Sequence, residues 1–308
     1  MTQPADAHPD MPADAHPDMP PPDMPPPDMP PDWPHRAASR VIACAPHRWH
    51  VQVMGAGPDI LLLHGAGGTT HSFRGLLPRL AADRRVIAPD LPGHGFTRGP
   101  RGRSGLDAMA ADLARLIAQE GWRPQGLVGH SAGGAIALRL AQILPDPPRV
   151  IGINAALGAF EGVAGWLFPA VARVLAVTPL VPTLFARLSS TDRRVRELLR
   201  STGSPLDDEG VDLYRRLVAR PDHVAGALSM MADWRLDGLR ASLPSIRVPV
   251  LLITSDRDTA VPPATSAEAA ARLGCARLLD LPGYGHLVHE EAPETVERAI
   301  RGFLGDAT

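Results

Sequence analysis

The stretch Gly129-His130-Ser131-Ala132-Gly133 decides the fold of this chain. It follows the apolar run 126–128 and precedes the helix-forming run 135–141. A Gly-x-Ser-x-Gly sequence between a strand and a helix is the pattern of a nucleophile elbow, where the serine lies in a sharp, strained turn and small neighbours admit the crossing chain. We therefore expect Ser131 to be a nucleophile, and the following helix to direct its free amides at a developing oxyanion.

A serine nucleophile of this kind needs an acid and a histidine later in the chain, in the order Ser, Asp, His. The acid is predicted just past the apolar strand 248–254, because a carboxylate at the end of a central parallel strand can reach the catalytic edge of the sheet. Asp258 is the candidate, by its position in the motif. Asp256 is the alternative, and its structural role would be a turn carboxylate that bonds its own backbone.

The histidine is predicted in the turn Pro282-Gly283-Tyr284-Gly285-His286, which follows a last strand at 278–281. Glycines on both sides of the tyrosine indicate an unusual loop conformation that can bring His286 over the sheet edge toward Ser131. His286 would then act as general base, while Asp258 fixes its tautomer and stabilises the imidazolium.

A metal site is the other interpretation of this region. His286, His289 and Glu290 are closely spaced, but no third cluster completes a set of ligands, so no metal is predicted. We expect His289 to be a surface or capping residue on the next helix.

An oxyanion needs two amide donors. One is the amide of Ala132, directly after the serine, and the other should come from the loop after an earlier strand. The strand 59–63 ends in the turn His64-Gly65-Ala66-Gly67-Gly68, so Ala66 or Gly67 is the predicted second donor and His64 a pocket residue. A phosphate-binding loop is excluded, since no Gly-Lys-Ser/Thr follows and the chain has no lysine, which also excludes a lysine Schiff base.

From residue 35 to residue 308 the pattern predicts one α/β domain. Strands and helices alternate up to residue 154, which is typical of a mainly parallel sheet with helices on both faces. The alternation stops over 155–240, where we expect a helical cap insertion. The predicted strands cover 40–45, 48–54, 59–63, 86–89, 149–154, 248–254 and 278–281, and the predicted helices include 72–82 and 106–120.

The first 34 residues differ from the rest. They hold seven aspartates, no arginine and thirteen of the 34 prolines, and they repeat PADAHPDM twice from residue 4 and PPPDM twice from residue 20. Their charge is −7, which leaves +5 on the remainder of a chain with net charge −2. Such a segment buries too little apolar surface to offset the entropy of ordering, so we expect a disordered tail with polyproline II character through residue 34. A docking arm and a neutral repeat expansion are its two interpretations.

Aromatic side chains gather in the predicted cap, which holds six of the thirteen in the chain. They predict a pocket for a bulky hydrophobic ligand, although the same residues can pack the cap onto the core. The apolar stretch 163–188 is interrupted by three prolines and Arg173, short of the roughly 20 residues that a membrane span needs. Contact of an amphipathic lid with a bilayer surface stays open. The predicted pocket residues of the cap are Phe160, Trp166, Phe168 and Trp234.

Cys44 and Cys275 are the only cysteines and lie far apart, which indicates reduced thiols in a cytosolic setting. No signal-peptide pattern opens the chain. We expect a cytoplasmic protein that binds neither nucleic acid nor a cofactor.

These motifs resemble those of the α/β-hydrolase superfamily and, within it, of the magnesium-chelatase accessory proteins of bacteriochlorophyll biosynthesis. The resemblance covers roughly residues 32–304, and the repetitive tail departs from it. The strings that carry it are Asp32-Trp33-Pro34, PHRWHVQ at 46–52, THSFR at 70–74, GHGFT at 93–97, the run 129–141, GINAAL at 152–157, GWLFP at 165–169 and STGS at 201–204.

The resemblance implies a place near the insertion of magnesium into protoporphyrin, with magnesium-chelatase subunits as partners. Because the chain has no P-loop and no acidic metal cage, we do not expect it to be the chelating engine. The triad favours hydrolysis of an ester, thioester or related acyl group on a bulky hydrophobic substrate, such as a porphyrin side-chain ester.

Two other functions stay open: a non-catalytic accessory that holds a tetrapyrrole, and a generic esterase or C–C bond hydrolase. Serine at position 131 argues against the dehalogenases and epoxide hydrolases of this fold, which use aspartate there.

Overall fold

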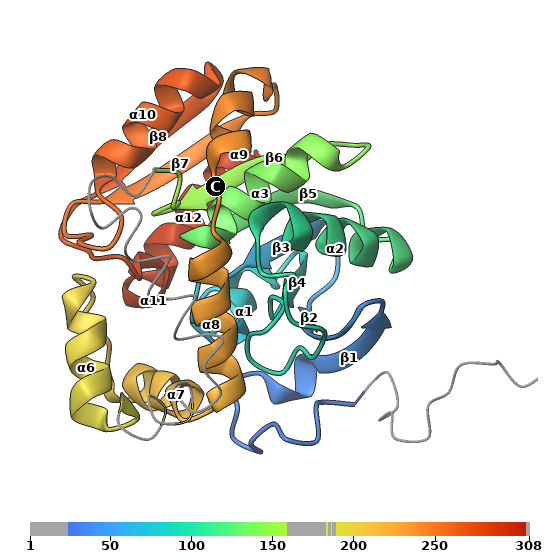
Figure 1. Ribbon diagram of the computed structural model, residues 1–308. Helices are drawn as coiled ribbons and strands as arrows, with labels where there is room; N and C mark the ends of the chain where they lie inside the picture. The colour runs from blue at the N-terminus through green and yellow to red at the C-terminus, as the bar shows by residue number, and fades with distance from the viewer. Residues whose placement is uncertain (1–23, 159–182, 184–185, 187–188, 306–308) are drawn as a thin grey trace, which may run out of the picture.

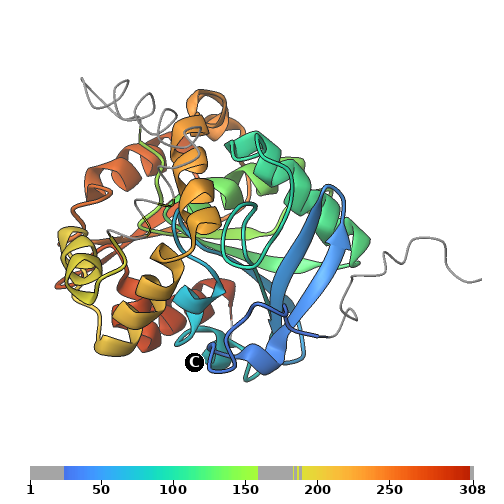
Figure 2. The same cartoon turned by 60° about the horizontal axis from the view of Figure 1, so that its bottom comes forward.

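The computed structural model describes residues 24–158, 183, 186 and 189–305. Its centre is an eight-stranded sheet in the order β1-β2-β4-β3-β5-β6-β7-β8 (Figure 1). The pairs β1–β2 and β2–β4 are antiparallel and the other pairs are parallel, so the sheet is mainly parallel with a hairpin at one edge (Figure 2). The strands are β1 (Ser39–Cys44), β2 (His47–Met54), β3 (Asp59–Leu63), β4 (Arg85–Pro89), β5 (Pro124–His130), β6 (Arg149–Ile153), β7 (Val250–Ser255) and β8 (Ala276–Leu281).

Helices cover both faces of this sheet. The α-helices are α1 (Leu77–Leu80), α2 (Leu106–Gln119), α3 (Ala132–Ile143), α6 (Asp192–Ser201), α7 (Asp208–Val218), α8 (Pro221–Asp233), α9 (Asp237–Ser242), α10 (Pro263–Leu273), α11 (Val288–Glu291) and α12 (Pro293–Leu304). Short 3-10 helices occur at η1 (Arg36–Ala38), η2 (Thr70–Phe73) and η3 (Leu243–Ser245). The α/β fold with helices around a mainly parallel sheet is thereby confirmed.

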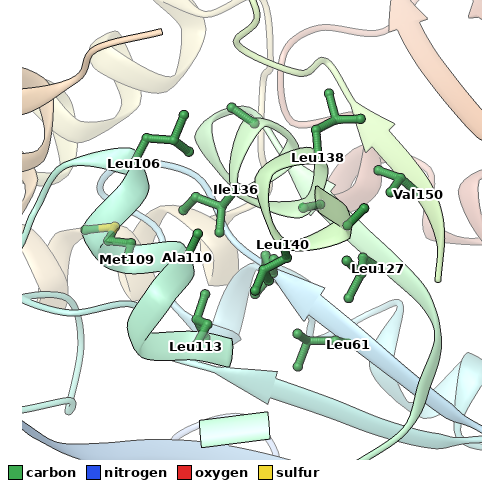
Figure 3. Close-up of a cluster of buried hydrophobic side chains, with 14 of the residues drawn as sticks. Leu61, Leu106, Met109, Ala110, Leu113, Leu127, Ile136, Leu138, Leu140 and Val150 are labelled. Atoms are coloured by element: carbon green, nitrogen blue, oxygen red, sulfur yellow. The ribbon is translucent and has the colours of Figure 1, made fainter. Parts of the chain in front are cut away.

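Side chains along β3 point alternately into two cores. Leu61 and Leu63 pack in one cluster with α2 and α3, whereas Ile60 and Leu62 pack in a second cluster with α1, α11 and α12. Because successive strand residues face opposite sides, a strand covered on both faces must be apolar throughout, which is why 59–63 is almost entirely apolar. Figure 3 shows the first cluster, in which α2 and α3 face each other over Leu61 and Leu127.

The predicted helix 72–82 is wrong in extent. The segment forms η2 and the four-residue α1 instead. Pro78 has no backbone N–H and follows the first residue of α1, and Gly75 lies against Pro293, where an added Cβ would come within 3.0 Å of the proline ring. The proline therefore starts a new helix and does not continue the first.

Between β6 and β7, α6, α7 and α8 lie together on one side of the molecule (Figure 1). Leu239 of α9 is buried in the first core, so this helix packs with the body of the domain. Trp234, directly after α8, is half-buried against the same core. The expected pocket residues Phe160, Trp166 and Phe168 lie outside the described residues. No helix in the described ranges has the length and hydropathy to span a membrane.

The first half of helix α8 contacts the loops after β3 and β4 through a histidine and a glycine. His223 accepts a hydrogen bond at Nδ1 from the Gly95 amide (3.1 Å) and donates one from Nε2 to the Gly67 carbonyl (3.1 Å). At Gly226 an added Cβ would lie 1.9 Å from the Gly93 carbonyl oxygen, so α8 approaches this loop backbone to backbone. His223 must be neutral, because one ring nitrogen accepts while the other donates.

Residues 24–34 differ from the expected disordered tail. Trp33 is 3% exposed and Met29 4% exposed, and both pack with Phe96 of the body and with two leucines of α7. Asp28 forms ion pairs with Arg98 and Arg220. The expectation of disorder through residue 34 is wrong for these residues, because their last repeat is followed by a tryptophan that supplies the apolar area the repeats lack.

Replacing Trp33 tests whether this N-terminal segment stabilises the domain. Trp33→Ala should lower the free energy of unfolding by about 3 kcal/mol, since it removes a large buried side chain from the contact with α7. Met24→Ala is the control, because Met24 is 50% exposed and should change stability by no more than about 0.5 kcal/mol. Urea denaturation measures both, and equal midpoints for wild type and Trp33→Ala would contradict the packing.

The anchor at His223 predicts a pH dependence. Burial lowers the pKa of His223 from 6.5 to about 4, so its contribution to stability is complete above pH 6.5 and is lost as the pH falls toward 4. An asparagine keeps one donor and one acceptor but does not titrate. The stability advantage of wild type over His223→Asn should therefore shrink by about 2 kcal/mol between pH 7 and pH 5 in urea titrations. A difference that stays constant with pH would refute the neutral histidine anchor.

Candidate active site

Ser131 lies where β5 turns into α3, with φ +52° and ψ −117°. A serine in this region is strained by about 1–3 kcal/mol and persists only where neighbours fix it. Two backbone hydrogen bonds do so here. The Ser131 amide donates to the Ile153 carbonyl (2.9 Å), and the Ser131 carbonyl accepts from the Ala156 amide (2.9 Å), so the elbow is tied to the end of β6.

The two glycines of the motif are required by close backbone packing. An added Cβ on Gly129 would lie 2.1 Å from the Gly133 carbonyl oxygen, and one on Gly133 would lie 2.1 Å from the Leu63 carbonyl oxygen. Real Cβ atoms do not make such contacts. The start of α3 is therefore pressed against the end of β3, and Ala132, the first residue of α3, lies beside the glycine-rich turn.

That turn is built against the serine. The Gly68 amide donates to the Gly65 carbonyl (3.1 Å), and Gly67 has φ +76°, a conformation that favours glycine. An added Cβ on Gly65 would come within 2.9 Å of the Ser131 Cβ, so the turn lies directly beside the elbow. The structure thus brings the turn containing Ala66 and Gly67 next to Ser131.

His64 does not line a pocket, contrary to the prediction. Its ring is fully buried, with Nδ1 2.8 Å from the Gly65 carbonyl oxygen and Nε2 2.9 Å from the Leu91 amide. Burial lowers its pKa, so the neutral ring donates from Nδ1 and accepts at Nε2. Both nitrogens are used by the backbone, and His64 connects the glycine-rich turn to the loop after β4.

Asp258 and His286 form a direct pair. The Asp258 Oδ2 and His286 Nδ1 atoms are 2.7 Å apart, and both residues are buried. The second carboxylate oxygen of Asp258 accepts from the amides of Ala260 and Val261, both at 2.8 Å. Asp256, the alternative, accepts from the Gly283 amide (2.6 Å) and is exposed.

Two residues that the sequence did not single out hold His286 by its backbone. Its carbonyl oxygen lies 3.0 Å from Nδ2 of Asn154 and 3.0 Å from Nε2 of His130. Asn154 has φ +44° and also reaches the Ser255 hydroxyl, so it joins the ends of β6 and β7 to the histidine loop. The sequence signal that could have identified Asn154 is a polar residue directly after an apolar strand. For His130 the signal is its place at the first variable position of the elbow motif.

His289 was expected at the surface, and this is wrong. It lies on α11, fully buried, with its ring centroid 4.3 Å from that of His130, and burial lowers its pKa to about 3. The spacing placed it on a helix but could not reveal that α11 is covered. Within the described residues, no group of three or more His, Cys, Asp or Glu side chains is arranged to hold a metal ion.

A second set of Ser, His and Asp side chains is joined by hydrogen bonds, which shows that this hydrogen-bond pattern alone does not identify an active site. His50 lies 2.7 Å from Asp90 through Nδ1 and 3.0 Å from the Ser39 hydroxyl through Nε2. All three residues are at most 3% exposed, and Gln52 donates to the same hydroxyl. Burial alone would raise the pKa of Asp90, but His50 holds it well below its usual range. This set binds the N-terminal hairpin to the body, whereas Ser131 is partly exposed.

Comparison with known proteins agrees with this arrangement. Residues 58–293 match the family model of the α/β hydrolase fold. The chain is 47% identical over 276 residues to the magnesium-chelatase 30 kDa subunit of Rhodobacter capsulatus, which covers 89% of this chain and 96% of that protein. It is 31% identical to the pimeloyl-[acyl-carrier protein] methyl ester esterase of Xanthomonas oryzae pv. oryzae, over 83% of this chain and 98% of that protein.

Among solved structures, a thermophilic esterase from Thermogutta terrifontis has a TM-score of 0.69 and 26% identity, covering 87% of this chain and 98% of that one. The elbow at Ser131, the doubly covered sheet and these similarities lead to one conclusion. The chain belongs to the α/β-hydrolase fold family.

Proposed function

We propose that this protein is a serine hydrolase that cleaves an ester or related acyl bond, with Ser131 as nucleophile, His286 as general base and Asp258 as its acid partner. The observation that carries the proposal is the 2.7 Å contact between Asp258 and Nδ1 of His286, which leaves Nε2 as the nitrogen that can accept a proton from a hydroxyl. The strained elbow supports Ser131 as that hydroxyl, because it presents the serine at the end of β5.

The reaction follows from these roles. His286 takes the Ser131 proton while the hydroxyl oxygen attacks the substrate carbonyl, and the imidazolium that forms is stabilised by the Asp258 carboxylate. The proton then passes to the leaving alcohol as the acyl-serine forms. A water molecule, deprotonated by the same imidazole, hydrolyses the acyl-serine and restores the hydroxyl.

The negative charge on the carbonyl oxygen needs donors that are already in place. The proposal assigns this role to the Ala132 amide at the start of α3 and to an amide of the turn at Ala66 or Gly67. Amides in the first turn of a helix have no carbonyl partner within that helix, and the close packing of Gly133 on Leu63 brings the two elements together. The ring of His130, whose centroid lies 4.6 Å from that of His286, favours this chemistry, since burial lowers the pKa of His130 well below its ordinary value and the neutral ring adds no positive charge beside the imidazolium.

The substrate class is proposed from two relatives. One is named as an esterase of a methyl ester on a carrier-bound acid, and the other as a subunit of magnesium chelatase. We infer a role in bacteriochlorophyll biosynthesis, associated with magnesium chelatase, and an ester of a bulky hydrophobic acid as substrate, with a porphyrin side-chain ester as the leading example. The predicted aromatic cap over 155–240 supports a large apolar ligand.

A second candidate function is supported by the name of the magnesium-chelatase relative. The chain would then hold or deliver a tetrapyrrole to the chelatase without breaking a bond. In that case the aromatic cap would bind the tetrapyrrole, and Ser131 would not be required.

Labelling with a fluorophosphonate tests the hydrolase directly. The wild-type protein should react at one serine, identified by mass spectrometry as Ser131. Ser131→Ala should give no adduct, and His286→Gln should slow labelling by at least about 10³-fold, because the hydroxyl loses its base. Ser39→Ala is the matched control and should label normally, since Ser39 belongs to the buried second set. A folded wild-type protein that fails to label would remove the hydrolase proposal.

Pigment synthesis separates the two candidate functions. In a bacteriochlorophyll-producing strain whose own copy is deleted, Ser131→Ala at wild-type protein level should fail to restore magnesium-tetrapyrrole formation if hydrolysis is required. Restored synthesis would instead support the binding role. Absorbance spectra of pigment extracts measure the outcome.

A further inference from the structure

One stretch of the cap runs between the two loops that carry Asp258 and His286. We call residues 201–204, Ser-Thr-Gly-Ser, the strap. It begins at the last residue of α6, and residues 205–207 connect it to α7, so it links two cap helices. Its sequence was part of the resemblance, but neither the fold nor the proposed mechanism explains it.

The strap binds the histidine loop by hydrogen bonds. The carbonyl oxygen of Thr202 accepts from the His286 amide (3.1 Å). The hydroxyl of Ser204, which is fully buried, accepts from the Leu287 amide (2.7 Å) and donates to Glu291 (2.6 Å). Glu291 in turn accepts from the Gly285 amide (3.0 Å). Three consecutive residues centred on His286 are thus held by the strap, directly or through one carboxylate.

The strap also binds the loop of the acid. The same Thr202 carbonyl lies 3.5 Å from the Thr259 amide, and the Thr259 hydroxyl donates to the Ser201 carbonyl (2.6 Å). Thr259 directly follows Asp258. One carbonyl oxygen therefore faces the amides of two residues, His286 and Thr259, that belong to different loops.

Gly203 and Gly285 fix how closely these segments meet. Gly203 has φ +86°, and an added Cβ there would lie 1.9 Å from the Arg257 carbonyl oxygen. A Cβ on Gly285 would lie 2.2 Å from the carbonyl carbon of Gly203. Side chains are excluded on both sides, so the strap fits between Arg257 and Gly285 with backbone contacts alone.

We propose that the strap is the positioning element of the Asp258–His286 pair, so that the place of the cap sets the alignment of the general base. The roles of these two residues rest on the proposed function; the contacts do not. The sheet supplies the starting points of both loops at the ends of β7 and β8, but the strap sets how far apart the loops are beyond those ends.

This arrangement couples the cap to the chemistry. Because the strap joins α6 to α7, any displacement of these helices moves the acceptor that holds His286 and Thr259. A large ligand that contacts the cap would therefore change the position of the His286 imidazole in addition to gaining affinity from the contact. A short ester that reaches Ser131 without contacting the cap would lose rate at the chemical step and not only affinity, as expected when remote binding energy sets alignment.

Two substitutions test the strap. Gly203→Ala places a methyl group against the Arg257 carbonyl. Gly305→Ala is its matched control, since Gly305 has φ +88° and an added Cβ there would lie 3.7 Å from the Arg149 guanidinium. Ser204→Ala removes the buried hydroxyl, and Ser245→Ala is its control, because Ser245 lies in η3, outside the strap, and its hydroxyl donates to the Ser242 carbonyl (2.7 Å). Circular dichroism establishes that each variant is folded.

The readouts are the rate of fluorophosphonate labelling and the proton resonance of His286 Nδ1–H, assigned with His286→Gln. Both strap variants should label roughly 10²-fold more slowly, the loss expected from misplacing a catalytic group by about 1 Å. With a short ester as substrate, kcat should fall more than KM rises. The Nδ1–H resonance should shift or broaden, and both controls should match wild type.

The outcomes are distinct. Strap variants that label at the wild-type rate and keep the resonance would overturn the proposal. If Gly203→Ala does not fold, Ser204→Ala decides the matter. If wild type itself does not label, the hydrolase proposal fails, while an altered resonance in folded Ser204→Ala still supports the strap and an unchanged one still refutes it.

Discussion

The left-handed backbone of Ser131 is the constraint on which the rest of the structure depends. It is possible only because Gly129 and Gly133 let the start of α3 pass against β5 and the end of β3, and because Ile153 of β6 and Ala156, shortly after β6, form hydrogen bonds with the two sides of the serine backbone. The same close approach places the first amides of α3 beside the turn at 65–68. A single side chain at either glycine would separate these elements and remove the elbow.

Around this elbow, the candidate site is assembled by backbone contacts from three parts of the chain. The sheet provides the ends of β5, β6, β7 and β8. The loops that leave these ends are joined by the buried imidazole rings of His64 and His130 and by the side-chain amide of Asn154. The cap contributes His223 and the strap, and residues 24–34 bind α7 and Arg220, the residue before α8. Most of these groups do not react; they determine where the reacting groups can lie.

The sequence predicted what local patterns determine. β3 was predicted to the residue, because the apolar run 60–63 is short, follows an aspartate and ends at a glycine-rich turn, as expected for a buried strand in an α/β chain. Asp258 was preferred to Asp256 by motif position, and it is the one paired with His286. Patterns failed where tertiary packing decides: the burial of His289, the fixed ring of His64 and the docking of Trp33 follow from neighbours that are distant in the chain. Asn154 and His130 bind a backbone carbonyl with their side chains, and Thr202 binds two backbone amides with its own carbonyl. Contacts to the backbone leave little trace in a single sequence.

The central claim is that Ser131, His286 and two amides converge on one reacting carbonyl. A crystal structure of the protein after reaction with a phosphonate tests this most directly, because the phosphorus mimics the tetrahedral carbon. We predict a covalent bond from the Ser131 hydroxyl oxygen to phosphorus, with the phosphoryl oxygen about 3 Å from the amide of Ala132 and from that of Ala66 or Gly67. His286 Nε2 should lie within hydrogen-bonding distance of the Ser131 oxygen. A phosphoryl oxygen that faces solvent, or an imidazole turned away from the serine, would contradict the account.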